Sequence, residues 1–512
     1  MLQGRPSTRP AFRLPNEVLL EIFDICRSGA ADMDKDMRWV NLTHVCRSWR
    51  LIALDYPTLW STLPLTSLSW TREMVVRSRT APLSVIAAVV DRREVDQLTE
   101  VMATHLPRMQ CIDIKVEPLA PHEWELLISS FMTPSAPLLQ ELSIRTSNMG
   151  SIPDDLFQNV APRLSVLRLT LCKINYSSYL FRGLTVLSLC LPKSSREERI
   201  NSIPSTRMLV AILRDSPLLK DLRLEYAGPL APPHTPLYSE RDVIPLPYLE
   251  HLELEDRTDV CMRVALQIQI PTQAFVRLDC DVYGVDTPCA SEVIEFVRKR
   301  CLSGAAEGNP LRTVEVAADD DMVRFQGLFG VEDQRRHLPA SGLGQCVLTN
   351  VMNSRYTTVL SLLEELPVDD VVVLRLDGPD LLGDMETLMD TLSLFPSVET
   401  LCIQGRDDSF GPLDMLWDAL ADDICDDPLK CFSGSCKHSV LLPRLHRLVL
   451  RLPLSAAWPH DEVESLCRWL RLRYEGEHPL SSVVIESVFD GDRRETIMDS
   501  VREWVDIVEW IS

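Results

Sequence analysis

The stretch LSVLRL at residues 164–169 has leucine at its first, fourth and sixth positions, separated by Ser, Val and Arg. Alternation of apolar and polar residues over five or six positions is typical of a short strand with one buried face. The pattern L-x-x-L-x-L, with conservative replacements, occurs thirteen times along the 512 residues. Clear copies start at Leu139, Leu164, Leu184, Leu219, Leu249 and Leu445, and looser copies at Met109, Phe275, Leu311, Leu343, Val371, Val398 and Leu480.

Segments with helical spacing lie between these copies. One of them places Met385, Leu388, Met389 and Leu392 at i, i+3, i+4 and i+7, which is the apolar stripe of a helix. The copies start about 31 residues apart on average. A strand and a helix repeated at this period stack with the strands parallel on a concave face and the helices outside. We therefore predict an α/β fold.

The region 109–488 resembles a degenerate leucine-rich-repeat solenoid. Its spacings run from 20 to 47 residues, and the Asn or Cys expected after each copy occurs once, as Cys172, so we expect an irregular coil. Six prolines in 228–247 predict a protruding loop, and another insertion is expected near 405–440. The alternative is an unrelated α/β domain with parallel strands.

The N-terminal stretch LPNEVLLEIF at 14–23 has helical periodicity of its own. Val18, Leu19, Ile22 and Phe23 form one apolar stripe, and Pro15 suits a first helical turn. A loop is expected over 27–37, and further apolar helical segments follow it. Three short helices in about 45 residues build only a small core, and such a module commonly binds a partner through its remaining apolar surface.

These residues resemble the F-box, in the form common among fungal F-box proteins. The resemblance covers 12–60 and is carried by Leu14-Pro15, Glu17-Val18-Leu19, Ile22-Phe23, Val45-Cys46-Arg47-Ser48-Trp49 and Pro57-Thr58-Leu59-Trp60. It implies binding to the Skp-type adaptor of a Skp–cullin–F-box ubiquitin ligase. By position, the contacts come from a first helix with Leu14, Pro15, Val18, Leu19, Ile22 and Phe23, and from a second with Val45, Cys46 and Trp49. The alternative is that all of these are core residues of a helical cap on the next domain.

The predicted domain organisation follows from these patterns. We expect a flexible N-terminus at 1–11, the F-box at 12–60, a connecting region with the start of the solenoid at 61–108, the repeat domain at 109–488 and a C-terminal capping helix at 489–512. The helix is predicted from five apolar residues that recur at intervals of four and three, namely Ile497, Val501, Trp504, Val508 and Ile511. A partner-binding amphipathic helix is the alternative for this segment.

Composition excludes several classes of partner. The net charge is −22, with residues 1–60 at +1, so the remainder repels phosphate and nucleic acid is not expected as a partner. The same acidic excess favours a protein substrate with a basic patch. No apolar run reaches the length of about 18 residues that a membrane helix needs, so no membrane association is expected. Fifteen scattered cysteines without a secretory signal indicate reduced thiols and a cytoplasmic or nuclear protein.

The sequence lacks several common catalytic, phosphate-binding and zinc-binding motifs. No GxxxxGK, GxGxxG, HExxH, C-x-x-C or G-x-S-x-G occurs, so we predict no catalytic residue, no cofactor and no metal. The spacing of Cys425, Cys431, Cys436 and His438 fits no usual zinc knuckle, and Asp319–Asp321 reads as a solvated turn. We predict a non-catalytic substrate-recognition subunit that binds the adaptor at its N-terminus and a substrate on its repeats. The alternatives are a repeat scaffold outside ubiquitination and an enzyme built from dispersed carboxylates and histidines.

Overall fold

The computed structural model describes most of the chain and divides it into two compact units, Met1–Pro232 and Pro233–Ser512. The residues described are 14–28, 37–63, 65, 67–194, 202–230, 243–281, 290–318, 323–329, 345–349, 357–377, 385–404, 416–417, 420, 441–451, 460–486 and 493–511. The predicted flexible N-terminus, the cysteine cluster at 425–438 and the aspartates at 319–321 lie outside these ranges, as do most of the proline-rich stretch and of the insertion near 405–440.

The first unit begins with short helices. They are α1 (Asn16–Ser28), η2 (Met37–Asn41), α2 (Leu42–Val45), α3 (Arg47–Leu54) and η3 (Pro57–Trp60). Pro15 directly precedes α1, and its carbonyl accepts the first intrahelical bond, from Leu19, at 3.2 Å. Pro57 starts η3, because a residue without an amide proton is tolerated in a first turn. The N-terminal region is therefore helical, as predicted.

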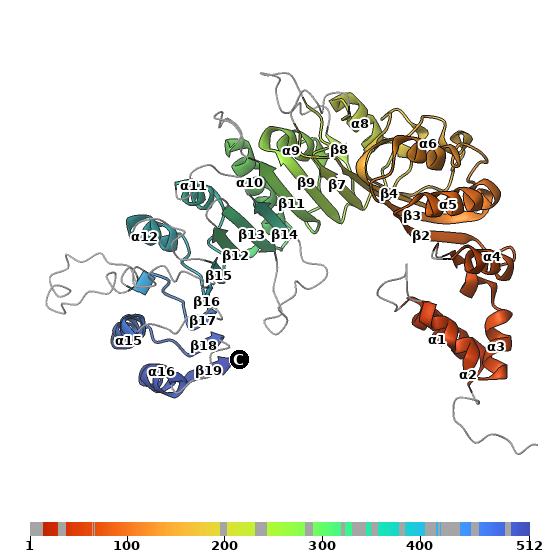
Figure 1. Ribbon diagram of the computed structural model, residues 1–512. Helices are drawn as coiled ribbons and strands as arrows, with labels where there is room; N and C mark the ends of the chain where they lie inside the picture. The colour runs from red at the N-terminus through yellow and green to blue at the C-terminus, as the bar shows by residue number, and fades with distance from the viewer. Residues whose placement is uncertain are drawn as a thin grey trace, which may run out of the picture. The chain divides into compact units, whose positions relative to one another are not determined.

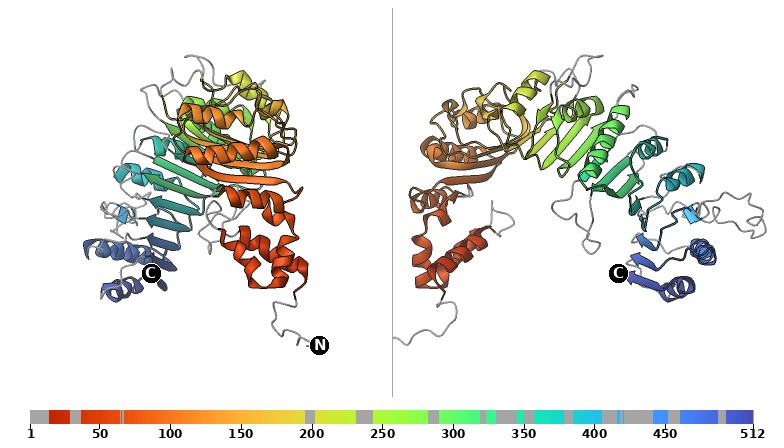
Figure 2. Two further views of the ribbon diagram at one scale, coloured as in Figure 1. Left: turned by 45° about the vertical axis from the view of Figure 1, so that its right-hand side comes forward. Right: turned by 180° about the vertical axis from the view of Figure 1, so that it is seen from behind.

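A parallel sheet follows in the same unit, each strand paired with the next along the chain. Its strands are β1 (Thr62–Leu63), β2 (Leu83–Val89), β3 (Met109–Val116), β4 (Glu141–Ser151), β5 (Val166–Lys173), β6 (Val186–Cys190) and β7 (Asp221–Glu225). Its helical connections are α4 (Leu68–Arg77), α5 (Arg92–His105), η4 (Leu106–Arg108), α6 (Pro121–Ser129), η5 (Leu156–Asn159), η6 (Tyr179–Phe181) and α8 (Thr206–Arg214). The helices lie on one side of the strands (Figure 2).

The register of this sheet explains the leucine pattern. Leu142, Leu167, Leu187 and Leu222 are direct neighbours across β4 to β7, and all are buried. The sixth positions of the same copies, two residues further on, form a second buried row. Side chains of period two that face the helices thus stack from strand to strand into one apolar core.

The second unit contains a sheet in the order β9, β11, β14, β13, β12, β15, β16, β17, β18, β19. Its strands are β9 (His251–Arg257), β11 (Phe275–Asp281), β12 (Leu311–Ala318), β13 (Val323–Phe329), β14 (Gln345–Thr349), β15 (Val373–Asp377), β16 (Thr400–Gln404), β17 (Arg447–Arg451), β18 (Ser482–Glu486) and β19 (Ile507–Ile511). The strands β8 (Ile244–Pro245) and β10 (Ile268–Gln269) form a separate pair.

Helices also separate the strands of the second unit and lie on one side of them (Figure 1). They are α9 (Thr258–Ala265), α10 (Ala290–Ala306), α11 (Thr357–Glu365), α12 (Met385–Ser393), α15 (His460–Glu475) and α16 (Arg493–Arg502). A strand lies at every one of the thirteen copies of the leucine pattern, although the start of the copy at 343 is outside the described residues. The mixed α/β class, with a helical N-terminal region and long runs of parallel strands, is confirmed.

Two elements differ from the prediction. The strand β13 was not expected, and it is antiparallel to both β12 and β14, so the sheet is not wholly parallel. The helix predicted over 489–512 is also wrong in its second half, because α16 ends at Arg502 and residues 507–511 form β19. The sequence IVEWI fits the alternation of a strand as well as it fits the spacing of a helix. The edge of β18 offers backbone hydrogen-bond partners to a strand, and a helix cannot use them.

Candidate functional site: the helical region at residues 14–63

The helix α1 has apolar residues on two of its faces. Leu19 and Phe23, one turn apart, are 3% and 0% exposed and pack into the interior of the helical region. Val18 and Ile25 lie seven residues apart on another face and are 39% and 64% exposed, with the half-buried Ile22 between them. The single stripe predicted from the sequence is therefore divided, with one half in the core and the other at the surface.

Aromatic rings fill the core behind α1. The ring centroids of Phe23 and Trp49 are 5.4 Å apart, and those of Trp39 and Trp60 are 5.2 Å apart. The indole Nε1 of Trp60 donates to the carbonyl oxygen of Ala53 at 2.8 Å, which satisfies the only polar atom of this buried side chain. The guanidinium of Arg77 lies 4.3 Å from the Trp60 ring, so α4 is packed against the same core.

Polar contacts hold α1 in place relative to the following segments. The hydroxyl of Tyr56 donates to Asp24 at 2.9 Å, and Arg27 donates to the Thr62 hydroxyl at 2.8 Å. Cys46 occupies the N-cap of α3, where its Sγ accepts a bond from the backbone amide of Trp49 at 3.4 Å. The Cys46 thiol therefore caps the first turn of α3, at the point where the chain passes from α2 to α3. This gives Cys46 a structural role in the motif Val45-Cys46-Arg47-Ser48-Trp49.

The nine residues predicted to bind the adaptor fall into three groups. Leu14, Pro15, Val18 and Val45 are exposed, with Val45 at 59%. Ile22, Cys46 and Trp49 are half-buried, whereas Leu19 and Phe23 are buried. The last two are therefore corrected from surface contacts to core residues, because α1 must bury one apolar face to form this core.

Two exposed apolar residues were missed. Ile25 and Leu51, which is 60% exposed, are as accessible as the predicted contacts. Ile25 stands seven residues after Val18, and that spacing in the sequence was the available signal for the outer face of the helix. The exposed apolar side chains of this region, Leu14, Val18, Ile25, Val45 and Leu51, are called the exposed apolar set below.

Comparison with known protein families identifies this region. Residues 11–65 match a family model described as F-box-like. This part of the chain is an F-box-like domain. The matched range agrees with the 12–60 predicted from the motifs, and the domain suggests a role in binding the Skp-type adaptor of a Skp–cullin–F-box ubiquitin ligase. No curated protein matches the chain significantly.

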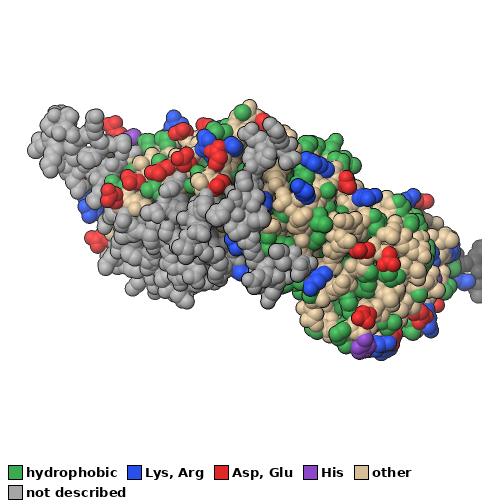
Figure 3. All heavy atoms as spheres, turned by 90° about the horizontal axis from the view of Figure 1, so that it is seen from above, with side chains coloured by type: hydrophobic (Ala, Val, Ile, Leu, Met, Phe, Trp, Pro, Cys, Tyr) green, Lys and Arg blue, Asp and Glu red, His purple; other side chains and the backbone are tan. Residues whose placement is uncertain are grey.

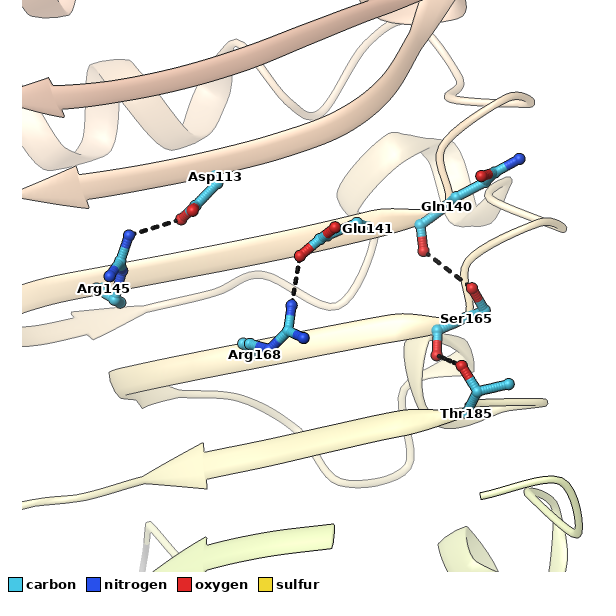
Figure 4. Close-up of polar contacts among 7 residues, drawn as sticks. All are labelled: Asp113, Gln140, Glu141, Arg145, Ser165, Arg168 and Thr185. Carbon is cyan, nitrogen blue, oxygen red and sulfur yellow. Dashed lines mark hydrogen bonds and ion pairs between the residues drawn. The ribbon is translucent and has the colours of Figure 1, made fainter. Parts of the chain in front are cut away.

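The strand face turned away from the helices carries a ladder of polar contacts beyond the F-box-like domain (Figure 4). Asp113 of β3 pairs with Arg145 of β4 at 3.0 Å, and Glu141 of β4 pairs with Arg168 of β5. In the second unit Arg451 pairs with Glu486 at 2.7 Å across β17 and β18. Acidic and basic side chains of the described strands thus pair on these faces, and both signs also occur over the surface shown in Figure 3.

Several described thiols are poor nucleophiles, because their pKa values are raised. Burial raises the pKa of Cys111 to about 12, and the neighbouring carboxylates of Glu141 and Asp113 add to the effect. Burial also raises the pKa of Cys172 and of Cys301 to about 12. Since the thiolate is the reactive form, these residues stay protonated and unreactive at neutral pH.

The described part of the chain has neither a metal-binding cluster nor a membrane-spanning helix. Within it, no group of three or more His, Cys, Asp or Glu residues is placed to hold a metal ion. No helix there is both long and apolar enough to cross a membrane. A cavity of about 620 Å³ lies beside α6 in the first unit, and its titratable lining residues are Glu117 and Glu125, without His, Cys or Lys.

Proposed function

We propose that this protein is the substrate-recognition subunit of a Skp–cullin–F-box ubiquitin ligase. The observation that carries the proposal is the F-box-like domain at residues 11–65, whose first helix has one face in the core and another apolar face exposed to solvent. The subunit would do no bond chemistry itself. Holding a substrate close to a ubiquitin-charged enzyme raises its effective concentration, and that is sufficient for such a role.

The exposed apolar set is proposed to contact the adaptor. An apolar side chain that moves from water into an interface contributes on the order of 1.5–3 kcal/mol when fully buried. Ile22, Cys46 and Trp49 are half-buried and would contribute their exposed edges, while Leu19 and Phe23 keep the helix in position from behind. The motifs at 45–49 and 57–60 also support the form of the domain common among fungal F-box proteins.

The remainder of the chain is proposed to bind the substrate as a degenerate leucine-rich-repeat solenoid. The thirteen strands at the leucine pattern and the helices on one side of them support this architecture. The substrate is proposed to bind to the polar faces of the strands. The proposed location of the protein is the cytoplasm or the nucleus. A basic substrate patch is supported by the acidic excess outside residues 1–60 and not by the strand faces, where acidic and basic side chains pair.

A pulldown of purified Skp-type adaptor by the full chain tests the proposal. The variant combines Val18→Glu with Val45→Glu, because both side chains are exposed and can change without disturbing the core. Val160→Glu, at an exposed valine outside the domain, is the matched control. We expect adaptor binding by the parent and the control and none by the double variant, with equal circular dichroism spectra. Absence of binding by the folded parent would refute the ligase role and favour the scaffold.

A further inference from the structure

A cavity opens in the first unit between α6 and the end of β4. Its volume is about 620 Å³, within the range of pockets that hold a ligand or a large side chain. Its floor is buried and includes Val116 and Ile128, whereas its rim includes the exposed residues Glu125, Ser129 and Met149. It lies at the carboxyl ends of β3 and of the regular part of β4, an edge of parallel sheets where ligands commonly bind.

The local irregularity of β4 makes this cavity. Arg145 pairs with Thr170 of β5 and Gly150 with Cys172, so residues 146–149 bulge out opposite Leu171 alone. The Thr146 hydroxyl donates to the Asn148 carbonyl within the bulge, with a second, longer contact of 3.2 Å to the Leu171 carbonyl of β5. Strand bulges re-aim side chains and are common beside binding sites. Here the bulge brings Met149 to the rim of the cavity.

Trp124 of α6 forms a wall of the cavity and is fixed there by β4. Its indole Nε1 donates to the carbonyl oxygen of Ser151 at 3.1 Å. A Cβ at Gly150 would lie 2.5 Å from the indole ring, so only glycine permits this close packing of the ring on the strand. The wall is therefore held in position before any ligand arrives, which lowers the entropy lost on binding.

The lining has the chemistry of a site for an apolar group with an attached positive charge. Most lining side chains are apolar, and they include Trp124 and two methionines, Met132 and Met149, whose flexible thioethers adapt to varied partners. The charged lining residues are Glu117 and Glu125, and no lysine or arginine lines the cavity. Glu117 already pairs with Lys115 at 2.7 Å, whereas the side-chain carboxylate of Glu125 makes no ion pair or hydrogen bond with the described residues.

We propose that this cavity binds a partner protein by taking one large apolar side chain that is adjacent to a lysine or arginine. The apolar side chain enters between Trp124 and Met149, and the cation meets Glu125 at the rim. The open, exposed rim admits a peptide segment that runs past the cavity. The inference rests on the proposed function in one respect, since it makes this cavity, at the carboxyl ends of β3 and β4, a second contact for the substrate besides the polar strand faces.

A random heptapeptide library displayed on phage, selected against the full chain, tests the inference. Enriched peptides are then measured by fluorescence anisotropy with the parent, Glu125→Lys, Met149→Ser and the control Asp215→Lys, which reverses the charge of an exposed residue next to α8. We expect the peptides to contain a large apolar residue beside Lys or Arg. Both cavity variants should bind them about tenfold more weakly or worse, and the control should bind them as the parent does.

Three results would overturn the inference. They are the absence of enrichment, enriched peptides without the apolar–basic pair, and equal binding by the parent and the cavity variants. The adaptor pulldown on the same preparation separates this inference from the ligase role. Adaptor binding without peptide binding refutes the cavity alone, whereas peptide binding of the expected kind without adaptor binding supports the cavity and refutes the ligase.

Discussion

At the scale of single residues, three arginines repeat one structural role. Arg108, Arg300 and Arg473 each follow a strand and donate back to carbonyl oxygens of the loop that leads into that strand. Arg473 is the most buried, with 1% of its surface exposed and bonds of 3.1–3.3 Å to four carbonyl oxygens. A planar guanidinium has five donors, more than any other side chain, and so satisfies several loop carbonyls at once.

Replacing Arg473 by leucine should destabilise the second unit by about 3 kcal/mol, because several buried carbonyl oxygens lose their donor. Burial lowers the pKa of Arg473 to about 10, so the side chain still carries its proton at neutral pH and keeps its donors. Thermal unfolding followed by circular dichroism measures the effect. Arg471→Leu, at the exposed ion pair with Glu475, is the control and should shift the midpoint much less. Equal shifts of the unfolding midpoint in both variants would contradict the role of Arg473 in holding the loop carbonyls.

Cys111 should resist alkylation at pH 8 even though its side chain is not fully buried. Its pKa is raised to about 12, so the thiolate fraction at pH 8 is very small and increases only as the pH approaches that value. Iodoacetamide labelling mapped by mass spectrometry checks this, with the exposed Cys26 as the reference within the same chain. Equal labelling of Cys111 and Cys26 in the folded protein would show that neither burial nor the carboxylates beside Cys111 protect it.

At the scale of elements, α1 shows how one amphipathic helix divides its apolar residues between the core and the surface. An α-helix has 3.6 residues per turn, so the side chains of neighbouring residues such as Val18 and Leu19 point in directions about 100° apart. One of them is exposed and the other is buried. The sequence placed them in one wide apolar stripe, and only the position of Trp49 and the rest of the core decides which edge of the stripe is covered.

Phe23→Ala should lower the free energy of unfolding of the first unit by about 3–5 kcal/mol, the usual loss for a large aromatic side chain in a core. Val18→Ala, on the exposed face, should change it by less than about 0.5 kcal/mol. Thermal unfolding and the adaptor pulldown are measured on both variants. We expect weaker adaptor binding from Val18→Ala at unchanged stability. Loss of stability in Val18→Ala comparable to that in Phe23→Ala would refute the division of α1 into two faces.

At the scale of the whole molecule, charge is distributed unevenly between the proposed binding regions. The whole chain carries a net charge of −22 and its first sixty residues carry +1, so the remaining residues carry −23. The exposed apolar set supplies the proposed adaptor contacts, whereas the strand faces present paired charges. The two proposed regions should therefore respond differently to ionic strength.

Adaptor binding should depend weakly on salt, because its proposed contacts are apolar. We expect its Kd to change less than about threefold between about 0.01 M and 1 M salt, a range in which the screening length falls from about 30 Å to about 3 Å. Titration calorimetry with the full chain and purified adaptor measures this. A much larger change would show that the acidic remainder of the chain acts on the adaptor at long range, or that charged residues make the contact.

The sequence by itself determined where thirteen of the strands lie, because alternation of apolar and polar residues is a local property and each copy of the leucine pattern contains it. It also determined the helical N-terminal region through apolar spacing and the flanking prolines. Only the tertiary structure decided that β13 inserts antiparallel between β12 and β14, that β4 bulges beneath Trp124 and that residues 507–511 leave their helical pattern to pair with β18. Each of these outcomes depends on a partner distant in the chain, whose exposed backbone groups or packing surface the local pattern does not encode.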